Sequence, residues 1–156
     1  MYTVYISHSV RPWELAQVYV LAQETERQGL RSFIPDRTWS PRHGLPSHLA
    51  DFIQQAQVVL LFATVGGHHN EWVNKEFEVA QGKQVLALVE QGTTIQGIVP
   101  DNIVEFSRSQ DLAEVVNVIT QRLAKLRLQE QTGNLVAGLV IGGLVLLLLR
   151  GLRGNQ

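Results

Sequence analysis

Cysteine is absent from this 156-residue chain, and positive charge is not in excess. Without a thiol the protein cannot form disulfides, use a thiolate nucleophile or hold zinc through sulfur. Its 13 lysines and arginines are balanced by 14 acidic residues, so the composition indicates no basic surface for nucleic acid. The length suits one domain with a full hydrophobic core and is short for two.

The sequence also lacks the patterns of a secretory signal and of a metal site. Residues 1–6 have neither the positive charges nor the long apolar segment of a signal peptide, so we expect the folded part to lie in the cytoplasm. The pair His68 and His69 has no carboxylate or third ligand at metal-binding spacing, so we expect a loop there and no metal.

What is present is a regular alternation of apolar and amphipathic segments, which is typical of an α/β protein. The strands are rich in Val, Ile and Leu, as expected where both faces of a sheet are covered. We therefore predict a flavodoxin-like five-stranded parallel sheet with helices on both faces. The predicted strands are 4–7, 30–34, 58–63, 85–89 and 103–106, and the predicted helices are 12–28, 47–56, 70–80 and 111–128.

Ligands of such sheets bind beyond the carboxyl ends of the strands. In this chain the first two strands lead into segments 8–11 and 35–46. The second segment is rich in Pro, Gly, Ser and Arg and is longer than most connections, which is typical of functional loops. We expect these two loops to form the binding region.

The helix predicted after the third strand carries the candidate for chemistry. Val73, Phe77 and Ala80 form an apolar stripe, and Trp72 and Glu76 lie four residues apart on a neighbouring face. An indole beside a carboxylate can raise the carboxyl pKa and offer a flat wall to a ring. The alternative is that Trp72 is half in the core and Glu76 is solvated or paired with a cation.

Composition changes abruptly near residue 134. Residues 135–149 contain no charged and no strongly polar side chain, and with the two preceding residues they approach the lower limit for crossing a bilayer as a helix. Gly138 and Gly142 form a small-xxx-small pattern that allows two helices to approach closely. A buried helix in an oligomer is the alternative interpretation.

These features predict a division of the chain into four parts. Residues 1–128 form the folded domain, 129–133 a linker, 134–150 a transmembrane helix and 151–156 a short basic tail. The expected topology is a single-pass C-terminal anchor with the domain in the cytoplasm.

Four segments of the domain resemble, in order, those of the TIR (Toll/interleukin-1 receptor) family. Residues 4–9 resemble the family's opening box, and 29–36 its second strand and the start of its BB loop. Residues 55–62 are similar to its third strand, and 71–76 to the helix that carries the catalytic glutamate of NAD-cleaving members. The resemblance implies a TIR fold, self-association through the domain, and a role in immune or anti-phage defence. The tail lies outside the resemblance, and self-association through the tail helix is expected from Gly138 and Gly142 instead.

The resemblance also implies a reaction, with NAD⁺ as substrate and no cofactor. NAD-cleaving TIR proteins break the nicotinamide–ribose bond and hydrolyse or cyclise the product, through an oxocarbenium-like transition state that a carboxylate can stabilise. It implies that Glu76 is catalytic and that Trp72 stacks on the leaving ring. The residues implied for substrate binding are Ser7, His8, Arg11, Asp36, Arg37, Trp39 and Trp72.

Other interpretations stay open from the sequence. Many NAD-cleaving members have an acidic residue just before the BB-loop glycine, whereas segment 40–44 has none and Asp36 is the nearest acid. Arg11 could be a solvated arginine, and Trp39 could be a contact between domains. The alternative function is a non-catalytic TIR adaptor that signals through TIR–TIR interaction, with Glu76 as a surface carboxylate.

Overall fold

A computed structural model describes residues 1–67 and 71–139, with only the backbone of residues 134–139. Met1–Leu123 forms one compact unit, and a second unit begins at Ala124. The first unit contains the sheet and all the candidate site residues, so it is the unit that positions the site.

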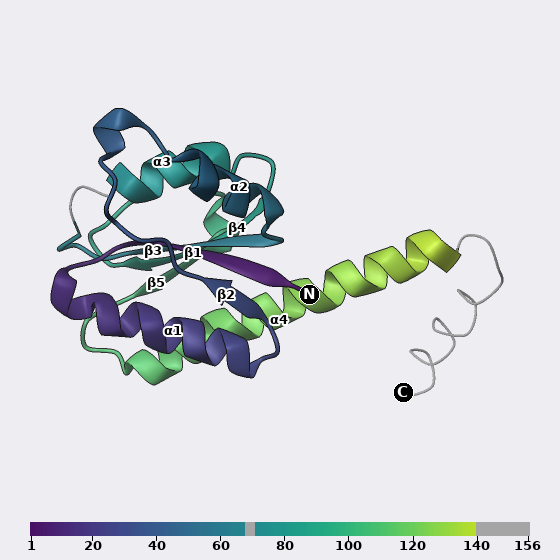
Figure 1. The fold of residues 1–156 in the computed structure, drawn as a ribbon. Helices are drawn as coiled ribbons and strands as arrows, with labels where there is room; N and C mark the ends of the chain where they lie inside the picture. Colours follow the sequence, from purple (N-terminus) through teal and green to yellow (C-terminus); the bar gives the residue numbers. More distant parts are fainter. Residues whose placement is uncertain (68–70, 140–156) are drawn as a thin grey trace. The chain divides into compact units, whose positions relative to one another are not determined.

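The first unit is built on a five-stranded parallel sheet (Figure 1). The strands lie in the order β2-β1-β3-β4-β5, which is the flavodoxin-like order predicted from the sequence. Their bounds are β1 Thr3–Ser9, β2 Arg31–Phe33, β3 Val58–Ala63, β4 Gln84–Glu90 and β5 Ile103–Phe106.

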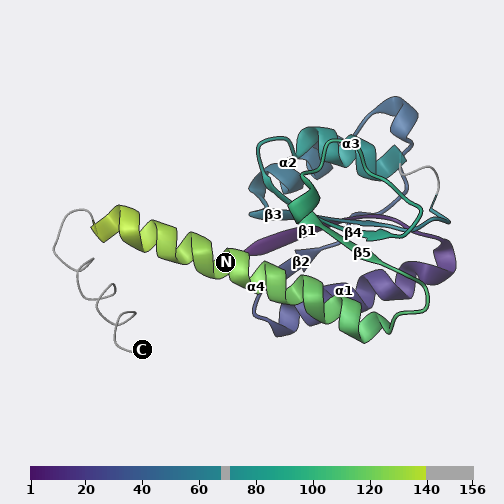
Figure 2. The same cartoon turned by 180° about the vertical axis from the view of Figure 1, so that it is seen from behind.

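Helices cover both faces of this sheet. Helices α2 and α3 lie on one face, and α1 lies with the first part of α4 on the other, as the two opposite views show (Figures 1 and 2). The helices are α1 Leu15–Arg27, α2 Ser47–Gln55, α3 Glu71–Val79 and α4 Leu112–Leu139, and the 3₁₀ turns are η1 Pro12–Glu14, η2 Pro41–His43 and η3 Pro100–Asn102.

The hydrophobic core surrounds the central strand of the sheet, β3. All six residues of β3 are buried. On one face, Ile53 of α2 and Val73 of α3 pack in a cluster with Tyr5 and Val59 of the sheet. Burial of each large apolar side chain contributes about 1.5–3 kcal/mol, so the carboxyl ends of the strands are held firmly in place.

The first strand is longer than predicted. We expected His8 to begin a loop, but β1 continues to Ser9, and His8 and Ser9 pair with Phe62 and Ala63 of β3. The strand prediction ended too early because it was based on side-chain polarity, whereas pairing with the neighbouring strand decides where a strand stops. The expected loop 35–46 likewise contains the turn η2.

Helix α4 runs without a break through residues 129–133, where we expected a linker. No helix in the part of the chain that the structure describes is both long and apolar enough to cross a membrane. Most of the expected span 134–150, and all of the expected tail 151–156, lie outside the described residues. The division into domain, anchor and tail therefore stays a prediction.

Candidate functional site

Glu76 is completely buried on the inner face of α3. The sequence pattern placed it beside the apolar stripe, but it lies on the stripe itself, between Val73 and Ala80, which are also completely buried. Phe77, expected in that stripe, is only partly buried. A carboxylate is stable in such a position only when its oxygens have hydrogen-bond or charged partners.

Four hydrogen bonds satisfy the Glu76 carboxylate. Arg37 binds it in a bidentate manner, with Nη1 2.7 Å from Oε1 and Nη2 3.0 Å from Oε2. Tyr5 donates its phenol proton to Oε1 at 2.7 Å, and Ser7 donates its hydroxyl proton to Oε2. Both oxygens are therefore occupied by neighbouring side chains of the same chain.

Tyr5 is a further residue of the site that was not predicted from the sequence, although the sequence contains a signal for it. Tyr5 and Ser7 are two residues apart on β1, so both side chains point to the face that α3 covers. The phenol pKa is raised strongly, first by burial and then by the negative charge of Glu76. The group therefore remains a proton donor to the carboxylate.

Arg37 joins the loop after β2 to the end of β1. Besides the Glu76 carboxylate it reaches the main-chain oxygen of His8, with Nη2 at 2.6 Å and Nε at 3.1 Å. These bonds, together with those to Glu76, fix the guanidinium plane. Ser7 and Arg37, assigned to substrate by the resemblance, are thus bound to the candidate catalytic residue.

His8 has the opposite orientation from Ser7, because side chains alternate along a strand. In the buried His8 ring, Nε2 lies 3.3 Å from the carbonyl oxygen of Pro35. A carbonyl oxygen can only accept a hydrogen bond, so Nε2 carries the ring proton. Burial, and after it the positive charge of Arg37, lower the His8 pKa to about 4. At neutral pH the ring is uncharged, so it offers a ligand hydrogen bonding and packing.

A cavity of about 250 Å³ opens beside this network. Its lining includes four of the predicted site residues, His8, Arg11, Arg37 and Trp72, whereas Glu76 is not among the lining residues. Trp72 also donates its Nε1 proton to the main-chain oxygen of Trp39 at 3.0 Å, which ties α3 to the loop after β2. Arg37 is therefore the residue that both lines the cavity and binds the Glu76 carboxylate.

Four predicted site residues are not part of the cavity lining: Ser7 and Glu76 of the hydrogen-bond network, and Asp36 and Trp39. Asp36 is exposed, and its carboxylate accepts hydrogen bonds from the Thr38 hydroxyl and main-chain nitrogen, which lower its pKa. Trp39 is half-buried, and its Nε1 has no hydrogen-bond partner among the described residues. In this structure both residues belong to the loop that carries Arg37.

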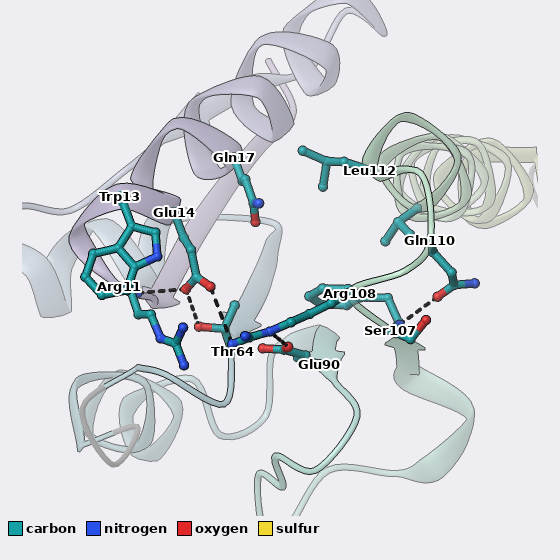
Figure 3. Close-up of a pocket in the computed structure, with 12 residues that line it drawn as sticks. Arg11, Trp13, Glu14, Gln17, Thr64, Glu90, Ser107, Arg108, Gln110 and Leu112 are labelled. Atoms are coloured by element: carbon teal, nitrogen blue, oxygen red, sulfur yellow. Dashed lines mark hydrogen bonds and ion pairs between the residues drawn. The ribbon is translucent and has the colours of Figure 1, made fainter.

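Arg11 follows the end of β1 and lines the cavity. Its guanidinium carbon is 5.4 Å from the centre of the Trp13 ring, and its side chain passes directly over Gly66. Arg11 also lines a second cavity, of about 320 Å³ (Figure 3). This second cavity could not be predicted from the sequence, because its lining comes from segments far apart in the chain.

No protein-family model and no curated protein sequence matches the chain. Among solved structures, the RPS4 and RRS1 TIR domain heterodimer is similar, with a TM-score of 0.60 and 13% identity over 79% of this chain and 96% of that one. The fold is that of a TIR domain. The TIR domains of the activated Roq1 resistosome, which directly recognizes the pathogen effector XopQ, give a TM-score of 0.55 and 13% identity, over 79% of this chain and 99% of that one.

The TIR fold predicted from four short segments is therefore confirmed. At this identity the likeness concerns the backbone arrangement, and the chemistry depends on the side chains described above. In this TIR-like fold the relevant features are the Glu76 network, the adjacent cavity and the loop that holds Arg37.

Proposed function

We propose that this TIR-domain protein cleaves the nicotinamide–ribose bond of NAD⁺, with Glu76 as the catalytic residue. The observation that supports the proposal best is the position of a buried, hydrogen-bonded carboxylate next to a cavity at the carboxyl edge of the sheet. Taking a carboxylate out of water costs several kcal/mol, and such costs are concentrated at functional sites.

The reaction requires little from the protein beyond this charge. Nicotinamide in NAD⁺ is cationic and leaves as a neutral ring, so no general acid is needed. A carboxylate beside the ribose stabilises the developing positive charge, and Tyr5 and Ser7 hold its two oxygens in place beforehand. Trp72 lines the cavity and provides a flat surface for the leaving ring, while Arg11 is placed for the diphosphate.

Arg37 has to leave before this chemistry can occur. Its guanidinium occupies both carboxylate oxygens, so a ribose cannot approach them while the pair is formed. We infer that the loop carrying Arg37 moves when TIR domains associate. The similar TIR structures are a heterodimer and an activated resistosome, which supports self-association as the trigger.

The same observation favours one alternative, a non-catalytic TIR adaptor. A carboxylate whose hydrogen-bond partners all belong to the same chain also suits a purely structural role, in which it anchors the loop after β2 in the shape that docks onto another TIR domain. In that case the protein acts in TIR-type signalling through TIR–TIR contacts, and Glu76 never meets a substrate. Both functions are compatible with a role in immune defence.

Nicotinamide release separates the two functions. We expect full-length protein concentrated on lipid vesicles to release nicotinamide from NAD⁺, and dilute protein to release much less. Glu76→Gln should abolish release, with a transition-state loss of about 3–4 kcal/mol or a rate ratio of 10²–10³ or more.

The matched control is Glu78→Gln. Glu78 lies on the exposed side of α3 and pairs only with Lys75 among the described residues, at 3.2 Å. Its removal should leave release unchanged. If clustered, folded wild-type protein releases no nicotinamide, the enzyme proposal fails and the adaptor function is favoured.

A further inference from the structure

The second cavity lies at the carboxyl edge of the sheet, beyond β3, β4 and β5 (Figure 3). Its volume of about 320 Å³ falls in the range of small-ligand sites, about 300–1,000 Å³. Four separate segments bring their side chains to it: η1 with the start of α1, the end of β3, the end of β4, and the connection from β5 to α4. The polar, charged and aromatic residues of the lining include Arg11, Trp13, Glu14, Thr64, Glu90 and Arg108.

Two carboxylates are fixed at the inner end of this cavity. Glu90 is buried, with Oε1 paired to Arg108 Nε and Oε2 accepting the main-chain proton of Val65 at 2.8 Å. Glu14 uses Oε2 twice, accepting from the main-chain nitrogen of Arg11 at 2.9 Å and from the Thr64 hydroxyl at 2.7 Å. These bonds hold both groups in one orientation.

The other oxygen of Glu14 has acceptor capacity to spare. Among the described residues, Oε1 of Glu14 forms a long ion pair with Nη2 of Arg108, at 4.0 Å. The Glu14 side chain is 13% exposed, and Figure 3 shows its carboxylate pointing into the cavity. Nucleotide-binding α/β folds use a carboxylate beyond the carboxyl end of a strand to accept ribose hydroxyl protons, and Glu14 of η1 offers such an oxygen.

Positive charge and an aromatic face complete the lining. Arg108 is 56% exposed although it is paired, so several of its donors remain available. The Arg11 guanidinium forms no ion pair among the residues that the structure describes. Trp13 is 72% exposed, which is unusual for so large an apolar ring, and the ring face that Arg11 does not cover is open to stacking.

We propose that this second cavity binds a ribonucleoside phosphate. The base stacks on Trp13, a ribose hydroxyl donates to Glu14, and the phosphate pairs with Arg11 and Arg108. A simple anion would not use the indole or the carboxylate, and a metal cation would be repelled by two guanidinium groups. The combination matches a nucleotide and no smaller ligand.

The nucleotide has two possible sources with the same chemistry. Arg11 lines both cavities, so the ligand is either the adenosine half of NAD⁺, with its nicotinamide half in the first cavity, or a free nucleotide. The first assignment rests on the proposed function, whereas nucleotide binding itself does not.

Calorimetric titration of full-length, detergent-solubilised protein with AMP tests the site. Loss of one stacking platform by Trp13→Ala should weaken AMP binding about ten- to hundredfold. Tyr19→Ala is the matched control, because Tyr19 is a 58% exposed aromatic residue of α1 outside the cavity, and it should leave binding unchanged. AMP without its 2′ and 3′ hydroxyls should bind more weakly to wild-type protein.

Arg108→Ala should also weaken AMP binding, with Arg122→Ala as control for an arginine of the same unit outside the cavity. Because Arg108→Ala leaves the buried carboxylate of Glu90 without its ion-pair partner, thermal melting checks whether this variant folds. If the Arg108→Ala protein does not fold, the result for Trp13→Ala decides. Absence of AMP binding, or binding that Trp13→Ala does not change, would overturn the proposal.

Competition identifies the source of the nucleotide. If AMP displaces NAD⁺ from Glu76→Gln protein, the cavity takes the adenosine half of the substrate; if AMP and NAD⁺ bind together, it takes a free nucleotide. Both results support the site. If the wild-type protein binds AMP but releases no nicotinamide, the nucleotide site is supported and the proposed reaction is refuted. If it releases nicotinamide but does not bind AMP, the proposed reaction is supported and the nucleotide site is refuted.

Discussion

The ion pair of Arg37 and Glu76 determines what this domain of TIR-like fold can do in the state that the structure shows. Glu76 is completely buried and the Arg37 side chain is only 17% exposed, so solvent screens their attraction weakly. The same Glu76 carboxylate fits both proposed roles, the catalytic one and the structural one. The difference is whether Arg37 can be withdrawn without unfolding the sheet edge.

Breaking this pair should be costly, and removing both charges should be cheaper. We expect Arg37→Ala to lower the free energy of unfolding by about 3 kcal/mol, because it leaves an uncompensated buried carboxylate. Arg37→Met combined with Glu76→Gln should recover much of that loss. Urea unfolding of the single and double variants measures the coupling. Additive effects would contradict a direct, buried interaction.

His8 predicts how stability depends on pH. Its pKa in the folded state is about 4, below the ordinary value of about 6.5, so the unfolded chain binds more protons between these values. The contribution of the uncharged His8 ring to the free energy of unfolding is therefore complete above about pH 6.5. It is lost as the pH falls towards 4, by up to about 3 kcal/mol. His8→Gln should show a smaller decrease between pH 7 and 5 than wild type. Parallel curves for the two proteins would disprove the assignment.

At the scale of elements, the turn after β3 determines how closely Arg11 and β1 can approach it. A Cβ at Gly67 would lie 2.2 Å from the main-chain oxygen of Ser9, which cannot move without disturbing β1. A Cβ at Gly66 would meet the side chain of Arg11, which is flexible. The absence of a side chain at Gly67 therefore allows the close approach of β1, and its absence at Gly66 leaves room for the Arg11 side chain.

This contrast gives a prediction at the same scale. Gly67→Ala should destabilise the fold by about 1–3 kcal/mol, as overpacking does, whereas Gly66→Ala should cost less stability and displace Arg11. Thermal melting measures the first effect, and AMP titration the second. Equal melting temperatures for the two variants would show that the turn adapts freely.

The elements were more predictable from sequence than the site. Runs such as 58–63 are buried on both faces and long enough to identify a central strand, and its position next to β1 follows from the α/β pattern. The pairing of Arg37 with Glu76 joins residues 39 positions apart, which no local periodicity reveals. The second cavity draws on four segments, and its residues are individually ordinary: exposed Trp13 and paired Arg108 carry no motif.

At the scale of the whole molecule, the proposed function depends on bringing TIR domains together. Withdrawal of Arg37 breaks two hydrogen bonds to Glu76 and two to the His8 carbonyl, so an isolated domain rarely opens. Contacts between domains can supply the compensating interactions. The apolar segment 134–150 offers a way to raise the local concentration, since molecules confined to a membrane meet more often than molecules in solution.

We therefore propose that residues 134–150 anchor the protein in a membrane with its TIR domain in the cytoplasm. The segment carries no charge before Arg150, and a helix satisfies all of its backbone groups internally. Its shortness suits a nearly upright helix with Arg150 and Arg153 reaching the far headgroups. We expect full-length protein to remain with membranes after a carbonate wash, and protein ending at residue 132 to be washed off. Leu146→Arg should weaken the anchor, because an arginine within the hydrocarbon costs about 2.5–3.5 kcal/mol. Full-length protein that stays in the supernatant as an oligomer without detergent would instead identify the segment as a buried assembly helix, and clustering would then need no membrane.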